Sequence, residues 1–348
     1  MTAHNPIVQA FVKLGGFIQD FCESHNSGAN IANADFKEVL AKAEQQNGWF
    51  TQENMLYSLG HWAHLLTEEN MATWLSQYAF EKGKNAKVVG IVMAGNIPLV
   101  GFHDFICVLL SGNKVQAKLS SNDTALLPYL AEQLVGFEGS LKDSIQFVDG
   151  KFNHFDAVIA TGSNNTSRYF EYYFGKKPNI IRKNRNAVAV LTGKETKEEL
   201  IALGEDIFRY YGLGCRNVSK IYVPKDYSFE LLFNSLFEYK DIIHQHKYAN
   251  NYDYNKAVYL MSEFKILDNG FLVLKEDEGF ASPIASLFYE HYDSLDAIKS
   301  FLEDRKEDIQ CVVSKGFLAS EIGFGETQKP GLKDYADGID TLDFLQQL

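Results

Sequence analysis

The sequence lacks the marks of several classes of protein. Its four cysteines, Cys22, Cys107, Cys215 and Cys311, are widely scattered along 348 residues and have no paired spacing. This distribution is typical neither of a disulfide framework nor of a zinc site, so we expect a reducing, cytoplasmic compartment. A charged start followed by a long apolar run is also missing at the N-terminus, and we therefore expect no signal peptide.

The chain also lacks an excess of basic charge and a long apolar segment. Its 45 acidic residues outnumber its 33 lysines and arginines, which gives a formal net charge of -12. Nucleic acid and anionic membrane surfaces are therefore not expected partners. No stretch is apolar enough for long enough to span a bilayer. Hydrophobic residues make up 46% of the chain, which suits one or two domains with a substantial core.

A metal-ligand set and the usual dinucleotide fingerprint are missing as well. His61 and His64 lie close together, but no further ligands lie near them in the sequence, and a metal site needs three or four. We therefore expect no metal. The segment nearest to Gly-x-Gly-x-x-Gly, residues 212–214, follows a helical pattern rather than a strand and lacks the third glycine. It is not interpreted as a dinucleotide loop.

What the sequence does contain is a regular alternation of helix and strand patterns. Up to about Lys84, apolar residues at three- and four-residue spacing predict a helical N-terminal layer. From Ala86 onward, strands and helices alternate, which is typical of parallel βαβ units in an α/β fold. The predicted helices are 6–21, 36–46, 52–67, 71–78, 99–110, 124–135 and 165–174, and the predicted strands are 87–93, 115–118, 144–148 and 155–160.

A second α/β pattern follows, with its start near Asn186. Its predicted strands are 187–191, 219–223, 270–274, 284–289 and 309–313. The segment Thr341–Leu345 near the end is interpreted as a closing strand, which either returns to the first domain or pairs with another subunit. We therefore expect a first domain at 1–185, a second domain at 186–320 and a C-terminal return segment at 321–348.

The turns after the strands of the first domain are candidate binding sites, because ligands of parallel sheets bind beyond the carboxyl ends of the strands. These turns cover residues 94–98, 118–123 and 161–166. In the last turn, Thr161, Gly162 and Ser163 precede a predicted helix, whose N–H groups and dipole would favour a phosphate. Plain N-capping by Ser163 or Thr166 would explain the same residues without a ligand.

Cys215 lies where a covalent catalyst would be placed. Apolar residues from Leu200 to Tyr211 recur at helical spacing, and Gly212 and Gly214 would end that helix just before the thiol. A thiol on a tight turn between a helix and a strand suits nucleophilic catalysis, although a small buried apolar residue would look the same. Arg216 beside it would lower the pKa of the thiol, unless it is simply a surface or salt-bridged arginine.

These motifs, in this order, resemble those of the aldehyde dehydrogenase superfamily. Within it, the chain is most similar to the long-chain fatty acyl-CoA reductases related to the acyl reductase of bacterial luminescence systems. The resemblance covers about residues 84–348. It implies an aldehyde dehydrogenase-like fold, in which a parallel Rossmann-type domain binds a cofactor and a second α/β domain carries the catalytic cysteine. Four motifs support it, namely Gly95-Asn96-Ile97-Pro98, Lys118-Leu119-Ser120-Ser121, Thr161-Gly162-Ser163 and Cys215.

The resemblance also implies a role for each matching residue. Cys215 takes the position of the nucleophile, and the amide of Asn96 lies in an oxyanion hole. Glu278 begins a weaker match, 278–283, which is similar to a segment that contacts the nicotinamide ribose but is one residue longer than usual. The adenosine ribose and the pyrophosphate of the cofactor would be held by Lys118, Ser120, Ser121, Thr161, Gly162 and Ser163.

Ser121 departs from the superfamily pattern and bears on the choice of cofactor. The superfamily turn usually ends in glutamate at this position, and a carboxylate would pair with a free 2′-hydroxyl and repel a 2′-phosphate. Serine with Lys118 nearby would admit the phosphate. We therefore predict a preference for NADPH.

A second departure concerns the fate of the acyl group. Aldehyde-oxidising relatives carry a glutamate that activates water, but no acidic residue lies between Pro178 and Leu191. Without such a base, hydrolysis of an acyl-enzyme should be slow. This favours reduction of a long-chain acyl thioester to the fatty aldehyde through an acyl group on Cys215. The alternatives are an aldehyde dehydrogenase that forms free acids, a non-catalytic assembly subunit on the same fold, and a hydrolase that pairs the thiol with a distant histidine.

A basic cluster suggests a partner. Phosphates of CoA or NADPH, or an acidic acylated carrier or synthetase protein, would suit it, and a solvated loop is the alternative. A homo-oligomer is also compatible with the sequence. The cluster consists of Lys176, Lys177, Arg182, Lys183 and Arg185.

Overall fold

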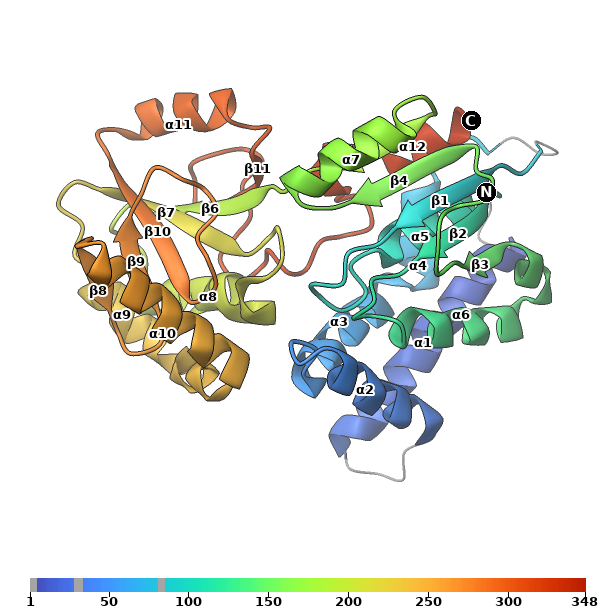
Figure 1. Ribbon diagram of the computed structural model, residues 1–348, viewed down its shortest axis with the longest axis horizontal. Coiled ribbons are helices and arrows are strands. Elements are labelled where there is room, and N and C mark those ends of the chain that lie inside the picture. Colours follow the sequence, from blue (N-terminus) through green and yellow to red (C-terminus); the bar gives the residue numbers. More distant parts are fainter. Residues whose placement is uncertain (1–4, 28–33, 81–84) are drawn as a thin grey trace. The chain divides into compact units, whose positions relative to one another are not determined.

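The computed structural model describes residues 5–27, 34–80 and 85–348. The chain divides into two compact units (Figure 1). Unit 1 comprises residues up to Lys183 together with Gly331–Leu348, and unit 2 comprises Asn184–Pro330. Within the part of the chain that is described, no helix combines the length and the apolar character needed to cross a membrane.

Unit 1 contains a five-stranded sheet in the order β3-β2-β1-β4-β5, and all of its strand pairs are parallel. This confirms the Rossmann-type sheet. The middle of β1 is buried, and the helices on the sheet leave little room for polar side chains there, so its sequence is almost continuously apolar. The strands are β1 (Val88–Val92), β2 (Lys114–Lys118), β3 (Ile145–Phe147), β4 (Ala157–Thr161) and β5 (Asn179–Arg182).

The helices of unit 1 bury one continuous apolar core. Helix α1 packs on α3 and α6. The fully buried side chains of this core include Phe11 on α1, Phe36 on α2 and Trp74 on α4. Burying such a side chain contributes roughly 1.5–3 kcal/mol. The helical N-terminal layer is thus confirmed. The helices are α1 (Pro6–Ser27), α2 (Ala34–Gln46), α3 (Gln52–Leu65), α4 (Glu68–Leu75), α5 (Phe102–Leu110), α6 (Leu126–Phe137), α7 (Asn164–Phe174) and α12 (Thr341–Gln346), with short 3-10 turns at Gly139–Asp143 and Ala336–Gly338.

The prediction of a closing strand at 341–345 is wrong, because this segment is helix α12. The carboxylate of Asp340 accepts a hydrogen bond from the backbone N–H of Asp343 (2.9 Å) and caps the helix. Leu342 and Leu345, three residues apart, then both reach the core of unit 1. A strand would place these two side chains on opposite faces. The tail does return to the first unit, where Tyr78 donates to Asp340 (2.7 Å).

Unit 2 contains a six-stranded sheet in the order β11-β6-β7-β10-β9-β8, in which only the pairing of β8 with β9 is antiparallel. Helices α8 and α9 and the 3-10 turn that follows α9 form the core on one face, and α11 packs on the other. The strands are β6 (Asn186–Val190), β7 (Val218–Pro224), β8 (Ile266–Asp268), β9 (Val273–Glu276), β10 (Ser286–Tyr292) and β11 (Ile309–Val313). The helices are α8 (Lys197–Phe208), α9 (Glu230–Leu236), α10 (His246–Met261) and α11 (Leu295–Asp304), with 3-10 turns at Arg209–Gly212 and Phe237–His244.

The segment before the tail belongs to unit 2. The buried carboxylate of Asp206 accepts hydrogen bonds from the backbone N–H groups of Gly325 (2.7 Å) and Thr327 (3.0 Å). The contacts therefore divide the chain at residues 183/184 and 330/331, whereas the sequence-based division treats 321–348 as one return segment. The difference arises from a buried contact across 119 residues of sequence, which no local pattern indicates.

Candidate active site

The turns after β1, β2 and β4 lie at the carboxyl edge of the sheet in unit 1. The strand order reverses between β1 and β4, which is the position where open α/β sheets bind ligands. The turn after β1 lies against the turn after β2. A Cβ atom added to Gly95 would lie 2.5 Å from the Cβ of Ser120, so only glycine permits this approach. The structure thus brings the Asn96 turn and the Ser120 turn together.

The turn that carries Asn96 is fastened on both sides. The side-chain amide of Asn47 donates to the carbonyl of Gly95 (3.0 Å), and the hydroxyl of Ser58 donates to the carbonyl of Pro98 (3.1 Å). Asn96 itself is half-buried between these anchors. Neither Asn47 nor Ser58 is predicted from the sequence as part of the site. A signal did exist for Ser58, which is a buried polar residue on the face of α3 that otherwise carries Met55 and Leu59.

The turn after β2 presents the residues expected at the adenosine ribose. Lys118 ends β2 and is half-buried, Ser120 is half-buried, and Ser121 is exposed. The turn is closed by a hydrogen bond from the N–H of Asp123 to the carbonyl of Ser120 (3.0 Å). No carboxylate occupies position 121, so this turn leaves an exposed hydroxyl where the superfamily pattern has an acid.

Asp123 gives this turn a pH-dependent stability. Its Oδ1 atom is buried without a hydrogen-bond partner among the described residues, and burial raises the pKa of the carboxyl from 3.8 to about 7. The folded pKa of Asp123 lies above the unfolded one. The protonated carboxyl therefore contributes fully to the free energy of unfolding below pH ~4, and this contribution is lost as the pH rises to ~7. Over that window, we expect the free energy of unfolding to fall by up to about 1.4 kcal/mol for each pH unit.

The substitution Asp123→Asn should remove this part of the pH profile, because asparagine does not ionise. Urea unfolding at a series of pH values measures the effect. Asp143→Asn, at an exposed position, is the control and should follow the wild-type profile. Parallel profiles for the wild type and Asp123→Asn would contradict the assignment.

The turn after β4 leads into helix α7. Thr161 ends the strand, and the hydroxyl of Ser163 accepts from the backbone N–H of Thr166 (3.3 Å), so Ser163 is the N-cap of α7. A Cβ atom on Gly162 would lie 2.9 Å from the ring of Phe170, so any other residue there would require this ring to shift. Capping therefore occurs as anticipated, and the binding of a phosphate by this turn stays a prediction.

The turn that precedes Cys215 is more unusual than its sequence indicates. Helix α8 begins at a capping box formed by Thr196 and Glu199 and ends at Phe208, so Tyr211 lies outside it. Tyr210 and Tyr211 both adopt left-handed backbone angles, with φ of 53° and 59°. Such angles cost roughly 1–2 kcal/mol for each residue other than glycine. Strain of this kind is found mainly at functional sites.

Cys215 is exposed at the end of this turn. Two other cysteines differ from it, because Cys22 and Cys107 are buried. Burial raises the pKa of the Cys22 thiol from 9.0 to about 11 and also raises the pKa of Cys107. These two thiols are therefore protonated and inaccessible at neutral pH, whereas Cys215 is open to solvent. A buried apolar role for Cys215 is excluded.

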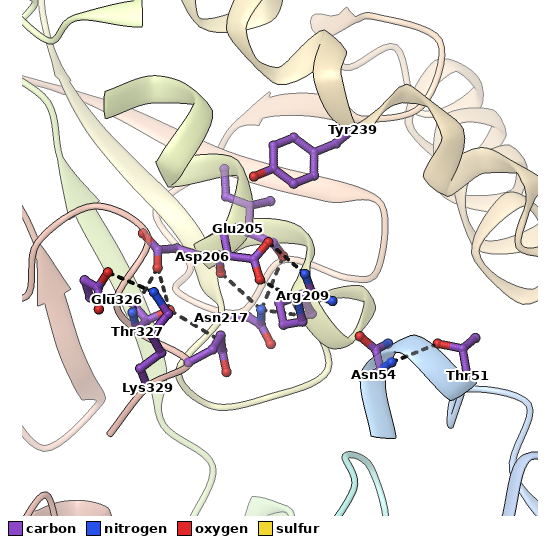
Figure 2. A network of polar contacts seen from close by, with 12 residues as sticks. Thr51, Asn54, Glu205, Asp206, Arg209, Asn217, Tyr239, Glu326, Thr327 and Lys329 are labelled. Atoms are coloured by element: carbon purple, nitrogen blue, oxygen red, sulfur yellow. Dashed lines mark hydrogen bonds and ion pairs between the residues drawn. The ribbon is translucent and has the colours of Figure 1, made fainter. Parts of the chain in front are cut away.

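Asn217 determines the shape of the Cys215 turn (Figure 2). Its side-chain amide donates to the carbonyls of Asp206 (3.1 Å) and Arg209 (2.8 Å) at the end of α8. Its Oδ1 accepts from the N–H of Gly214 (2.8 Å), and its own N–H donates to the Gly214 carbonyl (3.0 Å). Cys215 is thus held between two residues that are bonded to each other. This role of Asn217 is not predicted from the sequence, because its partners come together only once α8 is folded.

Arg216 has a structural contact. Its Nε donates to the carbonyl of Thr327 (2.6 Å), and Thr327 is also bound by Asp206 (Figure 2). Arg216 and Asp206 therefore secure residues 325–327 beside the Cys215 turn. The hypothesis that Arg216 lowers the pKa of the thiol stays a prediction.

The Glu278 segment lies near the start of the strand that follows Cys215. Glu278 is exposed on the loop between β9 and β10. The hydroxyl of Ser219, at the start of β7, donates to the carbonyl of Phe280 (2.6 Å). Within unit 2, the structure therefore brings the loop of Glu278 close to the strand that begins three residues after Cys215.

The basic cluster is not a continuous free patch. Arg182 is only 5% exposed and forms a buried ion pair with Asp104. Lys183 pairs with Glu171 (3.0 Å), and the ammonium of Lys177 lies over the ring of Phe155 (5.0 Å). The spacing in the sequence could not show these partners. Across the described ranges, no group of three or more His, Cys, Asp or Glu residues is arranged to hold a metal ion.

Comparisons with known proteins agree with this architecture. The model of the acyl-CoA reductase (LuxC) family matches residues 29–232, which is more than half of the chain. A comparison with curated proteins by sequence found no match.

Solved structures match over most of the chain. An NAD-dependent aldehyde dehydrogenase of Sinorhizobium meliloti has a TM-score of 0.65 at 13% identity, over 94% of this chain and 72% of that one. The NAD+ complex of a Bacillus cereus aldehyde dehydrogenase has 0.61 at 14%, over 90% and 72%. The NAD+ complex of a Mycobacterium tuberculosis aldehyde dehydrogenase has 0.61 at 14%, over 89% and 73%. These likenesses confirm the aldehyde dehydrogenase-like fold.

Proposed function

The chain belongs to the acyl-CoA reductase (LuxC) family, and from this premise we propose that it reduces a long-chain acyl thioester to the fatty aldehyde with NADPH, through an acyl group on Cys215. The observation that carries the proposal is the exposed thiol on a strained turn closed by Asn217. The thiols of Cys22 and Cys107 are buried and cannot meet a substrate in the folded state.

The residues at the edge of the unit 1 sheet fit a nicotinamide dinucleotide. Gly162 lies tightly against the first turn of α7, where backbone N–H groups and the helix dipole favour a pyrophosphate. Lys118, Ser120 and Ser121 would hold the adenosine ribose, and Thr161 and Ser163 would border the pyrophosphate. Glu278 would contact the nicotinamide ribose. When bound, the cofactor supplies the hydride.

The protein supplies the nucleophile and the oxyanion donors. The Cys215 thiolate attacks the thioester carbonyl, a new thioester forms at Sγ, and the donor thiol leaves with its sulfur protonated. After reduction of this acyl group, the bond to Sγ breaks, which releases the aldehyde and regenerates the thiol. We assign the stabilisation of the oxyanion to the Asn96 amide and the Cys215 N–H. One such donor contributes about 3 kcal/mol.

Release as an aldehyde rather than an acid follows from the residues around β5. No carboxylate lies between Pro178 and Leu191, so this segment offers no base to activate water. The acyl group on Cys215 should therefore persist until it is reduced. The donor we propose is acyl-CoA or an acylated protein.

Acyl-CoA-dependent oxidation of NADPH tests the proposal. The purified protein is given palmitoyl-CoA and NADPH, the nicotinamide absorbance is followed, and the product is trapped with a hydrazine. We expect one aldehyde for each NADPH consumed. If the protein instead reduces NADP+ while it converts a fatty aldehyde to free acid, the aldehyde dehydrogenase alternative is correct. No turnover in either direction would support a non-catalytic subunit.

The cofactor preference is tested by the substitution Ser121→Glu. A carboxylate at this exposed position would repel the 2′-phosphate and accept a hydrogen bond from a free 2′-hydroxyl. We expect the ratio of kcat/KM for NADPH to kcat/KM for NADH to fall by at least about tenfold, which corresponds to 1.4 kcal/mol. Ser121→Gln, of similar size but uncharged, is the control and should change this ratio less. An unchanged ratio in Ser121→Glu would contradict the preference for NADPH.

A further inference from the structure

Lys220 is a lysine in the interior of unit 2, five residues after Cys215. Its side chain is fully buried, and its ammonium pairs with the carboxylate of Glu290 at 2.7 Å. The same ammonium lies 5.0 Å from the ring centre of Tyr222 and 5.4 Å from that of Phe280. Burying the ammonium of a lysine costs desolvation free energy, and a single ion pair rarely stabilises a fold more than apolar residues of the same volume would. Stability alone therefore does not account for a charge at this position.

The ring of Phe280 belongs to the loop between β9 and β10, which also carries Glu278. The carbonyl of Phe280 accepts the hydrogen bond from Ser219, the residue before Lys220. Two consecutive residues of β7 thus hold the same loop residue, one at its backbone and the other at its ring. The loop is thereby tied to the strand that follows Cys215.

The other side of Glu278 is held by a second buried lysine. Lys275, on β9, pairs with Asp277, and Asp277 accepts a hydrogen bond from the N–H of Gly279 (2.8 Å). Lys220 and Lys275 lie opposite the same residue of β10, Phe288, from its two neighbouring strands. They therefore project from the same face of the sheet. Glu278 itself is exposed, so the loop is fixed at residues 277 and 280 while the carboxylate between them is open to a ligand.

We propose that Lys220 is a positioning residue that holds Phe280, and through it the 277–283 loop, so that Glu278 is presented to the nicotinamide ribose. The proposal rests on the role of Glu278 in the proposed function. Cation–π contacts and the hydrogen bond from Ser219 preorganise the loop before the cofactor binds. Without them, the cofactor would have to order the loop, and its affinity would fall.

The substitution Lys220→Met tests this, because methionine keeps much of the length and removes the charge. Glu290 remains partly exposed, with 36% of its side chain accessible, so its charge can be solvated. The readout is the Kd of NADPH from the fluorescence of the bound nucleotide, which requires no turnover. We expect Kd to rise about tenfold, and Lys220→Arg to recover most of the affinity because it keeps a cation over the rings. The rate at which iodoacetamide modifies Cys215 should stay at the wild-type value.

Lys256→Met is the matched control. Lys256, on α10, also pairs with a carboxylate of unit 2, Asp268 on β8, so this pair lies outside the strands β7 and β9 that carry Lys220 and Lys275. This variant should bind NADPH as the wild type does. If Lys220→Met is folded and binds NADPH normally, or if Lys256→Met weakens binding equally, the proposal is overturned. Should Lys220→Met fail to fold, Phe280→Ala decides, since it removes the ring from a half-exposed loop and must also raise Kd.

The two proposals fail in different ways. A wild-type protein that binds NADPH but does not reduce acyl-CoA would overturn the proposed function and leave the positioning role open to measurement through Kd. A wild-type protein that does not bind NADPH would overturn both. Normal reduction by the wild type, together with unchanged binding by Lys220→Met and Phe280→Ala, would overturn the positioning role alone.

Discussion

Substituting Cys215 by alanine should lower acyl-CoA-dependent NADPH oxidation by at least about 10³-fold, as expected when a covalent nucleophile is removed. The thiol is exposed on a turn fixed by Asn217 and held beside residues 325–327 by Arg216. Because alanine fits the same turn, the loss should come without a change in the free energy of unfolding. The measurement is the single-turnover rate with palmitoyl-CoA, together with mass spectrometry of the acylated protein.

Cys311→Ala is the control for this experiment. Cys311 is also in unit 2, on β11, and is partly buried. Its replacement should leave the rate unchanged and the acyl adduct in place. In the wild type, the adduct should map to the peptide that contains Cys215. Residual turnover of Cys215→Ala above about a tenth of the wild-type rate would show that another group accepts the acyl chain.

The parts of this structure that the sequence predicts are those with local signals. The strand β1 and the turn after it follow from an apolar run that ends in glycine and proline. The position of Cys215 between a helix and a strand follows in the same way. In each case the pattern arises because the residues bury themselves against neighbours that any parallel α/β sheet provides.

The parts that the sequence does not predict depend on distant partners. The mixed apolar and polar segment 341–345 fits a strand or a helix, and the cap from Asp340 together with the burial of Leu345 decides for the helix. Helix α8 ends before Tyr211 because Asn217, which follows in the chain, takes its last carbonyls. The anchors of the Asn96 turn, Asn47 and Ser58, likewise lie 48 and 40 residues from the carbonyls they bind.

The basic segment before unit 2 likewise has a charged residue whose partner the sequence does not indicate. A run of lysines and arginines is usually solvated, and Arg182 alone would be interpreted that way. Its guanidinium instead meets Asp104 of α5, 78 residues earlier, and binds it through both nitrogens of the fork. It also donates to the hydroxyl of Thr341 (3.2 Å), the first residue of α12. A single buried side chain therefore joins β5, α5 and the returning tail.

Arg182→Met should consequently lower the free energy of unfolding by about 3–5 kcal/mol, the usual cost of leaving one member of a buried ion pair without its partner. The uncompensated charge would be Asp104, which is 4% exposed. Urea unfolding followed by tryptophan fluorescence measures the loss. Hydrogen exchange should also become faster across Thr341–Gln346, because this helix loses the bond to Thr341.

The double variant Asp104→Leu/Arg182→Met separates the charge from the packing. It leaves no buried charge at this site, so we expect it to regain most of the lost stability and to lie within about 2 kcal/mol of the wild type. Lys183→Met, which breaks only the exposed pair with Glu171, should cost less than about 1 kcal/mol. If the single and double variants were equally unstable, the side-chain volume of Arg182, rather than the ion pair with Asp104, would be what holds the tail to unit 1.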